Sequence, residues 1–158
     1  MENFTKRFNV RVYGVCIEDG KLLISDELQG GKCFTKLPGG GLEFGEGIGD
    51  CLRREFTEEL QAEIEVKELF YVNDFLQLSA FDSNSELIVI YYNVSFRTRP
   101  NARFSETPFD FEYCENGAIA FRWIPLTDLS PTMMHFPIDK VVVNKILERE
   151  QGKINHGD

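Results

Sequence analysis

The sequence has few of the residues on which several common kinds of site depend. It contains only two histidines, His135 and His156, so catalysis by a Ser/His or Cys/His pair is poorly supplied. Its four cysteines are widely spaced without a CxxC pair, which fits neither a zinc site nor a disulfide framework. No stretch approaches the roughly 18 apolar residues of a membrane span, and the first residues lack the apolar run of a secretory signal. We therefore expect a cytoplasmic protein with reduced thiols.

Positive charge is also scarce. Lys and Arg number 17 against 26 Asp and Glu, which gives a formal net charge of -9. Because contacts with nucleic-acid phosphates need a concentrated basic surface, this composition disfavours nucleic acid as a partner. A small phosphorylated ligand held through a metal remains compatible with it. The length of 158 residues and the apolar content of 42% predict one folded domain over residues 1–158, with a core of about 8–150.

The pattern of apolar residues predicts both strands and helices. An Asp19-Gly20 hairpin signal joins two expected strands at 8–18 and 21–27. Further strands are expected at 34–37, 64–78, 87–96 and 118–124, with loops at 29–33, 82–86 and 97–110. A helix is expected after Glu46, where apolar residues recur at helical spacing, and others at 126–129 and 138–149. Together these elements predict an α/β fold with a mixed sheet.

The most informative stretch, residues 40–62, joins a glycine-rich turn to an acidic helix. On a helix Glu55 and Glu59 share one face, and Glu58 flanks them. Like charges at this spacing cost roughly 0.2–0.5 kcal/mol per pair, and no Lys lies one turn away on that face to relieve them. A bound Mg²⁺ would remove this cost, since it prefers carboxylate and carbonyl oxygens. The alternative that the charge pattern leaves open is a solvated acidic helix face.

The spacing of this stretch resembles the signature of the Nudix hydrolases, the hydrolases of nucleoside diphosphates linked to another moiety. The positions that match in register are Gly40, Glu46, Arg54, Glu55, Phe56, Glu58 and Glu59. Two positions depart from it, because Gln61 stands where the family has Gly and Ala62 is small for the last apolar site. Since that Gly normally ends the helix, we expect Gln61 to let the helix run on by a residue or two. The resemblance implies a Nudix-type α/β/α sandwich with a mixed β-sheet, a glycine-rich loop and a catalytic helix.

The resemblance also implies a role for each matching residue. Glu55, Glu58 and Glu59 would bind Mg²⁺ together with the Gly40 carbonyl, with Mn²⁺ as a substitute. Glu46 and Arg54 would tie the loop to the helix through a charge-assisted pair. A late-loop carboxylate often serves the family as a further ligand or general base, and the candidates here are, in order, Glu115, Glu112 and Glu106. The general base, for which Glu55, Glu58 and Glu115 are the catalytic candidates, is not assigned by the sequence.

The family's common reaction is attack of water on a phosphoanhydride. We therefore expect a Mg²⁺-dependent pyrophosphohydrolase acting on a nucleotide or nucleoside diphosphate derivative. The candidates for contacts with its phosphates and base are Lys36, Arg97, Arg99 and, among the aromatics of 70–81, Phe75. Each of these is also explained by a plain surface charge or a core position.

Several alternatives stay open at this point. The domain could be a non-catalytic sensor or binding module for a nucleotide-linked metabolite. A capped-RNA pyrophosphohydrolase and an isoprenoid diphosphate isomerase rank lower, because the chain lacks a basic tract and a suitably placed Cys. A homodimer could form through the apolar segments 70–81 and 87–92.

Overall fold

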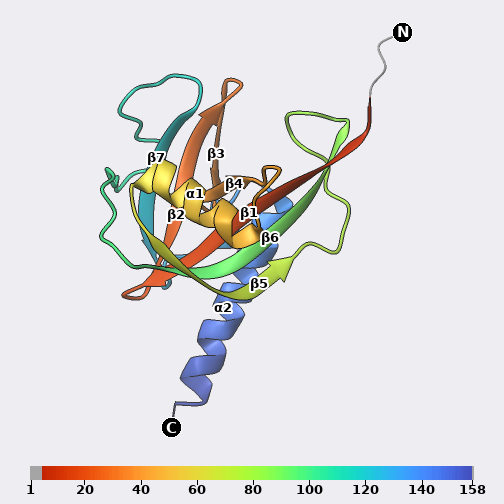
Figure 1. Ribbon diagram of the computed structural model, residues 1–158. Helices are drawn as coiled ribbons and strands as arrows, with labels where there is room; N and C mark the ends of the chain where they lie inside the picture. Colours follow the sequence, from red (N-terminus) through yellow and green to blue (C-terminus); the bar gives the residue numbers. More distant parts are fainter. Residues whose placement is uncertain (1–4, 158) are drawn as a thin grey trace. The chain divides into compact units, whose positions relative to one another are not determined.

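The computed structural model describes residues 5–157, and their contacts divide the chain into two units (Figure 1). The first unit combines the described residues up to Cys16 with Pro38–Ala102. The second combines Ile17–Leu37 with the described residues from Arg103 onward. Strand β1 (Arg7–Glu18) begins in the first unit and ends in the second. The expectation of one domain over residues 1–158 stays a prediction.

A mixed sheet forms the first unit. β1 runs parallel to β6 (Ser85–Phe96), which pairs in turn with antiparallel β5 (Ile64–Val72). The short strand β4 (Gly39–Gly41) pairs with β1 in antiparallel fashion and sets Gly40 opposite Val12. The glycine turn is therefore hydrogen-bonded to a central strand and does not hang free as a loop.

Helix α1 (Ile48–Leu60) packs on this sheet through its apolar side, and Figure 1 shows it lying across β1 and β6. The Phe56 ring centroid lies 5.9 Å from that of Phe96 on β6. Gly14 of β1 permits this approach, because a Cβ there would lie 2.9 Å from Phe56 Cζ. With Leu52 and Leu60 also buried, the acidic residues of α1 are left on the remaining side of the helix.

The end of α1 corrects one expectation. The helix stops at Leu60, and Gln61 adopts the left-handed conformation with φ 49° and ψ 45°. Its N–H donates to the Thr57 carbonyl at 3.1 Å, and its Oε1 accepts a hydrogen bond from Asn101 Nδ2 at 2.9 Å. The expected extension of the helix is wrong, because Gln61 takes the conformation that glycine adopts most easily.

The second unit contains an antiparallel sheet. β2 (Lys21–Gln29) pairs with β3 (Lys32–Lys36) and, along its other edge, with β7 (Ala118–Pro125). The end of β1 also pairs with the start of β2, where Ile17 faces Leu22. The apolar side chains of this sheet, such as Leu23 and Phe121, are buried.

Two helices complete the second unit. The short 3-10 helix η1 (Pro131–Met133) precedes the long helix α2 (Pro137–Asn155). Phe136, at the start of α2, stacks with Phe34 of β3 at a centroid distance of 5.2 Å. The first half of α2 is anchored by buried Ile138, Val142, Val143 and Ile146, whereas residues 151–157 are exposed. None of the helices among residues 5–157 combines the length and the apolar character needed to cross a membrane.

The α/β class with a mixed sheet is confirmed, but some expected elements have other limits. The strand expected at 64–78 stops at Val72. The cause is Asn73, whose side chain donates to the Leu87 carbonyl at 3.1 Å and accepts from Val89 N at 2.8 Å. A side chain thus occupies the place of the next backbone pair, and 73–84 becomes a loop.

Three further expectations shift. The loop expected at 29–33 narrows to a turn at Gly30 and Gly31, because Gln29 and Lys32 pair across the strands. The helical turn expected at 126–129 is instead a turn closed by Asp128 N and the Pro125 carbonyl, and η1 follows it. The last helix extends well beyond the expected 138–149.

Replacing Gln61 with Gly should stabilise the protein by roughly 1 kcal/mol relative to Gln61→Ala, because glycine has no Cβ penalty in the left-handed conformation. Both variants lose the hydrogen bond to Asn101, so their comparison isolates the backbone effect. Urea unfolding of the two variants and the wild type measures it. Equal stabilities of the Gly and Ala variants would contradict the prediction.

Candidate active site

The loop between β4 and α1 is fixed to the first turn of the helix. Cys51 N donates to the Gly47 carbonyl at 3.0 Å and closes that turn. Asp50 Oδ2 accepts a hydrogen bond from Gly47 N at 2.9 Å. An acidic residue in the first turn also interacts favourably with the helix dipole. The start of α1 is therefore held in a defined position relative to the loop.

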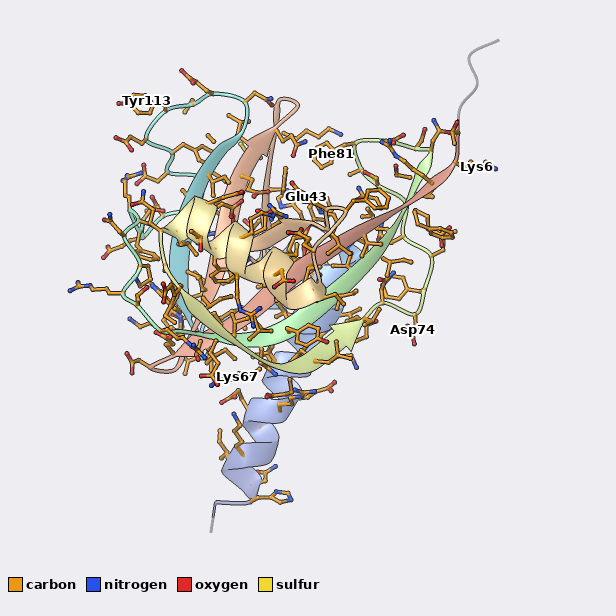
Figure 2. The ribbon with its side chains drawn as sticks, viewed as in Figure 1. Lys6, Glu43, Lys67, Asp74, Phe81 and Tyr113 are labelled. Atoms are coloured by element: carbon orange, nitrogen blue, oxygen red, sulfur yellow. The ribbon has the colours of Figure 1, made fainter. Side chains whose placement is uncertain are left out.

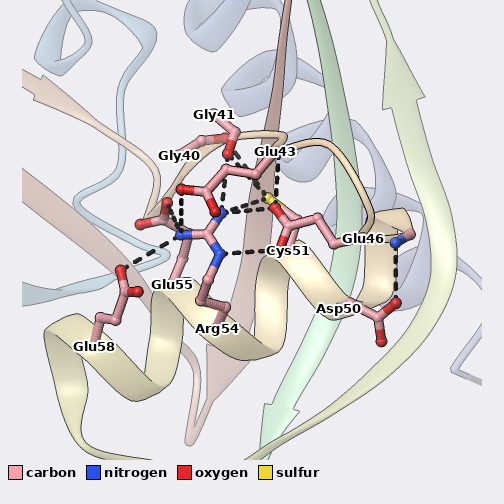
Figure 3. Close-up of polar contacts among 10 residues, drawn as sticks. Gly40, Gly41, Glu43, Glu46, Asp50, Cys51, Arg54, Glu55 and Glu58 are labelled. Atoms are coloured by element: carbon pink, nitrogen blue, oxygen red, sulfur yellow. Dashed lines mark hydrogen bonds and ion pairs between the residues drawn. The ribbon is translucent and has the colours of Figure 1, made fainter.

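Arg54 joins the helix to this loop through a bidentate ion pair with Glu46 (Figure 3). Its Nε donates to Glu46 Oε2 at 2.9 Å and its Nη2 to Oε1 at 2.7 Å. Nη2 also donates to the Gly41 carbonyl at 3.0 Å. The side chains of Arg54 and Glu46 are only 23% and 13% exposed, so the pair is largely shielded from water. Bidentate pairs of this kind are among the stronger charge-assisted contacts in proteins.

This pair shifts the pKa values of the groups around it. Hydrogen bonds from Arg54 are the main cause that lowers the pKa of Glu46 to about 2. The same bonds raise the pKa of Arg54 above its usual value. Burial, together with the Glu46 charge, raises the pKa of the neighbouring Cys51 thiol to about 12. Cys51 therefore stays protonated, and it does not supply a nucleophilic thiolate.

The third nitrogen of Arg54, Nη1, faces the acidic side of the helix. It lies 2.9 Å from Glu55 Oε1 and 3.4 Å from Glu58 Oε2. The Glu55 side chain is 12% exposed, whereas that of Glu58 is 58% exposed. The sequence offers no Lys one turn away to relieve these carboxylates, but Arg54 relieves them through its branched head group. The sequence does not predict this contact, because the resemblance implies for Arg54 only the pair with Glu46 that ties the loop to the helix.

Glu55 also lies directly against the backbone of the glycine turn. A Cβ at Gly40 would overlap Glu55 Oε1, so only glycine allows the carboxylate to approach this closely. Gly39 has φ 143°, and a Cβ there would overlap the Val12 carbonyl oxygen. Gly40 therefore admits the Glu55 carboxylate, and Gly39 admits the close approach of the turn to β1.

The donor set suits a hard divalent cation. Glu55, Glu58 and Glu59 all lie on α1, and Glu55 is placed directly beside Gly40 of the glycine turn. Carboxylate and carbonyl oxygens are the ligands such cations prefer. Within residues 5–157, however, no three His, Cys, Asp or Glu side chains are grouped so as to hold a metal ion. The residue types are therefore those that a divalent cation prefers. In this structure, however, the positive group in contact with Glu55 and Glu58 is Arg54 Nη1.

The candidates for substrate contacts are spread over the chain. Lys36 lies at the end of β3 with a side chain only 4% exposed, and its Nζ is 3.2 Å from Glu27 Oε1. Arg97 is exposed just after β6, and its N–H donates to the Glu63 carbonyl at 2.8 Å. Phe75 lies in the loop 73–84 and is 38% exposed. Their roles stay predictions.

The late-loop carboxylates belong to the second unit. Glu115, Glu112 and Glu106 are all exposed in the segment between Arg103 and β7. Figure 2 shows the side chain of Tyr113 pointing away from the same loop. The Glu115 N–H donates to the Tyr113 carbonyl at 3.0 Å, which gives the loop a local turn. The choice of Glu115 as base also stays a prediction.

One charged cluster was not foreseen from the sequence. Asp26 of β2 is fully buried and accepts two hydrogen bonds from Arg122, at 2.6 Å and 2.9 Å. It also accepts one from Thr35 Oγ1 at 2.7 Å and one from Phe109 N at 3.1 Å. The sequence does contain one indication of this cluster, because Asp26 is an acidic residue at an inward position of an apolar strand. With both oxygens satisfied, Asp26 serves to hold β2, β3, β7 and the late loop together.

These features define an α/β domain in which a glycine turn and an acidic helix are joined by an arginine–glutamate pair. The family model of the NUDIX domain matches residues 5–145. The chain therefore belongs to the Nudix hydrolase family. Members of this family generally need a divalent metal and act on nucleotide-derived small molecules.

Solved structures share this fold. The E. coli ORF135 protein aligns with a TM-score of 0.70 and 18% identity, covering 94% of each chain. A MutT NUDIX hydrolase from Burkholderia pseudomallei aligns with a TM-score of 0.65 and 19% identity, over 88% of this chain and 98% of its own. An ADP-ribose pyrophosphatase from Streptococcus suis gives 0.57 and 14%, over 90% and 91%. A comparison with curated protein sequences found no match.

Replacing Glu46 with Gln should destabilise the protein most near neutral pH and less as the pH falls. Folding lowers the Glu46 pKa from 4.5 to about 2, so its contribution is full above the unfolded value and is lost toward the folded one. Melting temperatures of wild type and variant between about pH 7 and pH 2 should therefore converge below about pH 4.5.

Glu43→Gln is the matched control, because the Glu43 side chain is 69% exposed and its oxygen lies 3.8 Å from Arg54. This variant should differ little from the wild type across the range. A Glu46→Gln deficit that stays constant with pH would show that the carboxylate charge does not stabilise the fold.

Proposed function

We propose that this protein is a Mg²⁺-dependent pyrophosphohydrolase that cleaves a phosphoanhydride bond in a nucleotide or nucleoside diphosphate derivative by attack of water. The observation that supports it most is the position of Glu55, which is set against Gly40 and shares Arg54 with Glu58. Family membership supports the reaction class. The net charge of -9 fits a site that meets phosphates through a cation more readily than through a basic surface.

We assign cation binding to Glu55, Glu58 and Glu59, with the Gly40 carbonyl, and take Mn²⁺ as a substitute for Mg²⁺. When bound, such a cation neutralises phosphate charge, activates water and stabilises the leaving group. Arg54 and Glu46 act through position, since their bidentate pair keeps the loop and the helix in register. Glu55, Glu58 and Glu115 are the carboxylates proposed to take the proton from the attacking water.

The proposed substrate is a small molecule that carries a diphosphate. One similar structure is named an ADP-ribose pyrophosphatase, which suggests ADP-ribose as the first compound to test. Arg97 is exposed and open to such a ligand. Phe75 is 38% exposed and could contact the ligand only where the dimer proposed below leaves its ring uncovered. Lys36 could contact a phosphate only by exchanging its ion pair with Glu27.

The direct test is a panel of nucleoside triphosphates, ADP-ribose, nucleoside diphosphate sugars and dinucleotides, each incubated with and without Mg²⁺. The expected result is Mg²⁺-dependent release of a nucleotide and a phosphorylated product from at least one of them. If none is cleaved while one raises the melting temperature, the protein is a nucleotide-metabolite sensor and the proposal fails.

Replacing Glu59 with Gln should lower kcat on the best substrate by roughly a hundredfold or more while the protein stays folded. Glu65→Gln is the matched control, because it makes the same charge change at an exposed position of β5. Retained activity in Glu59→Gln would remove Glu59 from the metal site. In the same assay the rate of Glu115→Gln should fall well below that of Glu112→Gln, and near-normal rates for both variants would exclude Glu115 and Glu112 as the base.

We also propose that the protein forms a homodimer through residues 69–81. This segment holds six exposed large apolar residues, which are Leu69, Val72, Phe75, Leu76, Leu78 and Phe81. Monomeric proteins rarely expose so many in one place. The sequence also suggests 87–92 as a possible interface. That segment lies in β6, whose edges pair with β1 and β5, and we do not include it in the proposed interface.

Light scattering during size-exclusion chromatography should therefore give the mass of two chains for the wild type. Leu76→Asp, at a position 67% exposed, should give the mass of one chain. Ile154→Asp, at a position 77% exposed on α2, is the control and should remain dimeric. A wild-type mass of one chain at every concentration tested would refute the dimer.

A further inference from the structure

The head group of Arg54 is divided between two sets of partners. The edge formed by Nε and Nη2 binds Glu46 and the Gly41 carbonyl at 2.7–3.0 Å. Nη1 turns the other way, toward Glu55 at 2.9 Å and Glu58 at 3.4 Å. One side chain thus serves both the loop and the carboxylates proposed to bind the cation.

We infer that Arg54 Nη1 competes with the divalent cation for Glu55 and Glu58, so that Arg54 limits how tightly the cation binds. This inference rests on the proposed metal-dependent function. Nη1 lies within hydrogen-bonding distance of oxygens from both carboxylates, which is where a cation bound by both would carry its charge. Nη1 contacts one oxygen of each carboxylate, and a cation held by the same two carboxylates would lie close to Nη1, where the two positive charges repel each other. Cation binding therefore requires Nη1 to give up at least part of its contact with them.

The structure provides a way for Nη1 to move while Arg54 keeps its place. The bidentate contact with Glu46 holds the rest of the guanidinium, and this contact does not involve Glu55 or Glu58. Glu43 offers a third carboxylate, with Oε1 at 3.8 Å from Nη1 and a side chain 69% exposed. Because the guanidinium is planar and rigid, Nη1 moves only when the whole head group tilts about its contact with Glu46, and such a tilt can bring Nη1 from Glu55 and Glu58 toward Glu43.

The contact of Arg54 Nη1 with Glu55 and Glu58 also stabilises these carboxylates before a cation binds. Glu55 and Glu58 would repel each other and Glu59 if nothing positive lay between them. Nη1 keeps Glu55 against Gly40 and holds Glu58 nearby, so the ligands are already placed. The cost is a lower affinity for the cation. Arg54 is in this sense a positioning residue that sets the cation concentration at which the site fills.

The test is a titration of the full-length protein with Mn²⁺, followed by electron paramagnetic resonance at low ionic strength. Arg54→Lys should bind Mn²⁺ roughly three- to tenfold more tightly than the wild type. Arg54→Gln also loses the pair with Glu46 that positions the carboxylates, so it should gain less affinity than Arg54→Lys. Lys retains the charge but has a single ammonium group, which we expect to remain with Glu46. Tighter binding in Arg54→Lys would therefore reflect the lost Nη1 contact and not a change in net charge.

Arg53→Gln is the matched control, because Arg53 is the neighbouring residue, its side chain is 54% exposed and it contacts Asp50 instead. Its Mn²⁺ affinity should change less than twofold. Melting temperatures give a second readout, since Mg²⁺ should raise that of Arg54→Lys by more than that of the wild type.

Two results would overturn the inference, and they are distinguishable. If the wild type binds Mn²⁺ and Arg54→Lys binds it no more tightly, the competition is absent while the metal site stands. If the wild type itself binds no Mn²⁺ and shows no Mg²⁺-dependent change in melting temperature, the proposed metal-dependent function fails as well. Should Arg54→Gln not fold, Arg54→Lys and the wild type decide the matter.

Discussion

The bidentate pair between Arg54 and Glu46 is the interaction on which the first unit's candidate site depends. It connects the first part of α1 to the loop that follows β4, and through Gly41 it reaches the glycine turn itself. Its low exposure makes it stronger than an ordinary surface ion pair. Without it, the carboxylates of α1 would keep their helical spacing but lose their fixed relation to Gly40.

Much of this arrangement could be predicted from the sequence because it follows from local rules. The alternation of apolar residues located the strands, and the spacing of Leu52, Phe56 and Leu60 located the buried side of α1. The spacing from Gly40 to Glu59 indicated the Nudix family, and the family model over residues 5–145 confirms that resemblance. The period of the apolar residues and the spacing of the motif can be read from the sequence without knowledge of the tertiary contacts.

What could not be predicted depends on contacts between residues distant in sequence or on a choice among conformations. Gln61 was expected to extend the helix, but it adopts a left-handed conformation and binds Asn101. Asn73 ends β5 because its side chain binds the backbone of β6. The buried pair of Asp26 and Arg122 joins residues 96 positions apart, and only the register of β2 and β7 brings them together. None of these features follows from a local pattern.

The candidate site therefore contains two sets of charged contacts. One is the ion pair between Arg54 and Glu46, and the other joins Arg54 Nη1 to the helix carboxylates Glu55 and Glu58. A hydrolase that depends on a cation needs both sets of contacts. The carboxylates must stay close together, and they must still be able to exchange Arg54 Nη1 for the cation. Apart from Lys36 of β3, the residues proposed to recognise the rest of the substrate lie in the strands and loops after α1.

The role of Arg54 beside a bound cation is tested most directly by a crystal structure with Mg²⁺ and a non-hydrolysable diphosphate analogue. We predict a cation bound by Glu55 and Glu58, with Arg54 still paired to Glu46 and its Nη1 no longer in contact with Glu55. A cation bound away from α1, or a bound cation with the Nη1 contacts to Glu55 and Glu58 unchanged, would contradict it.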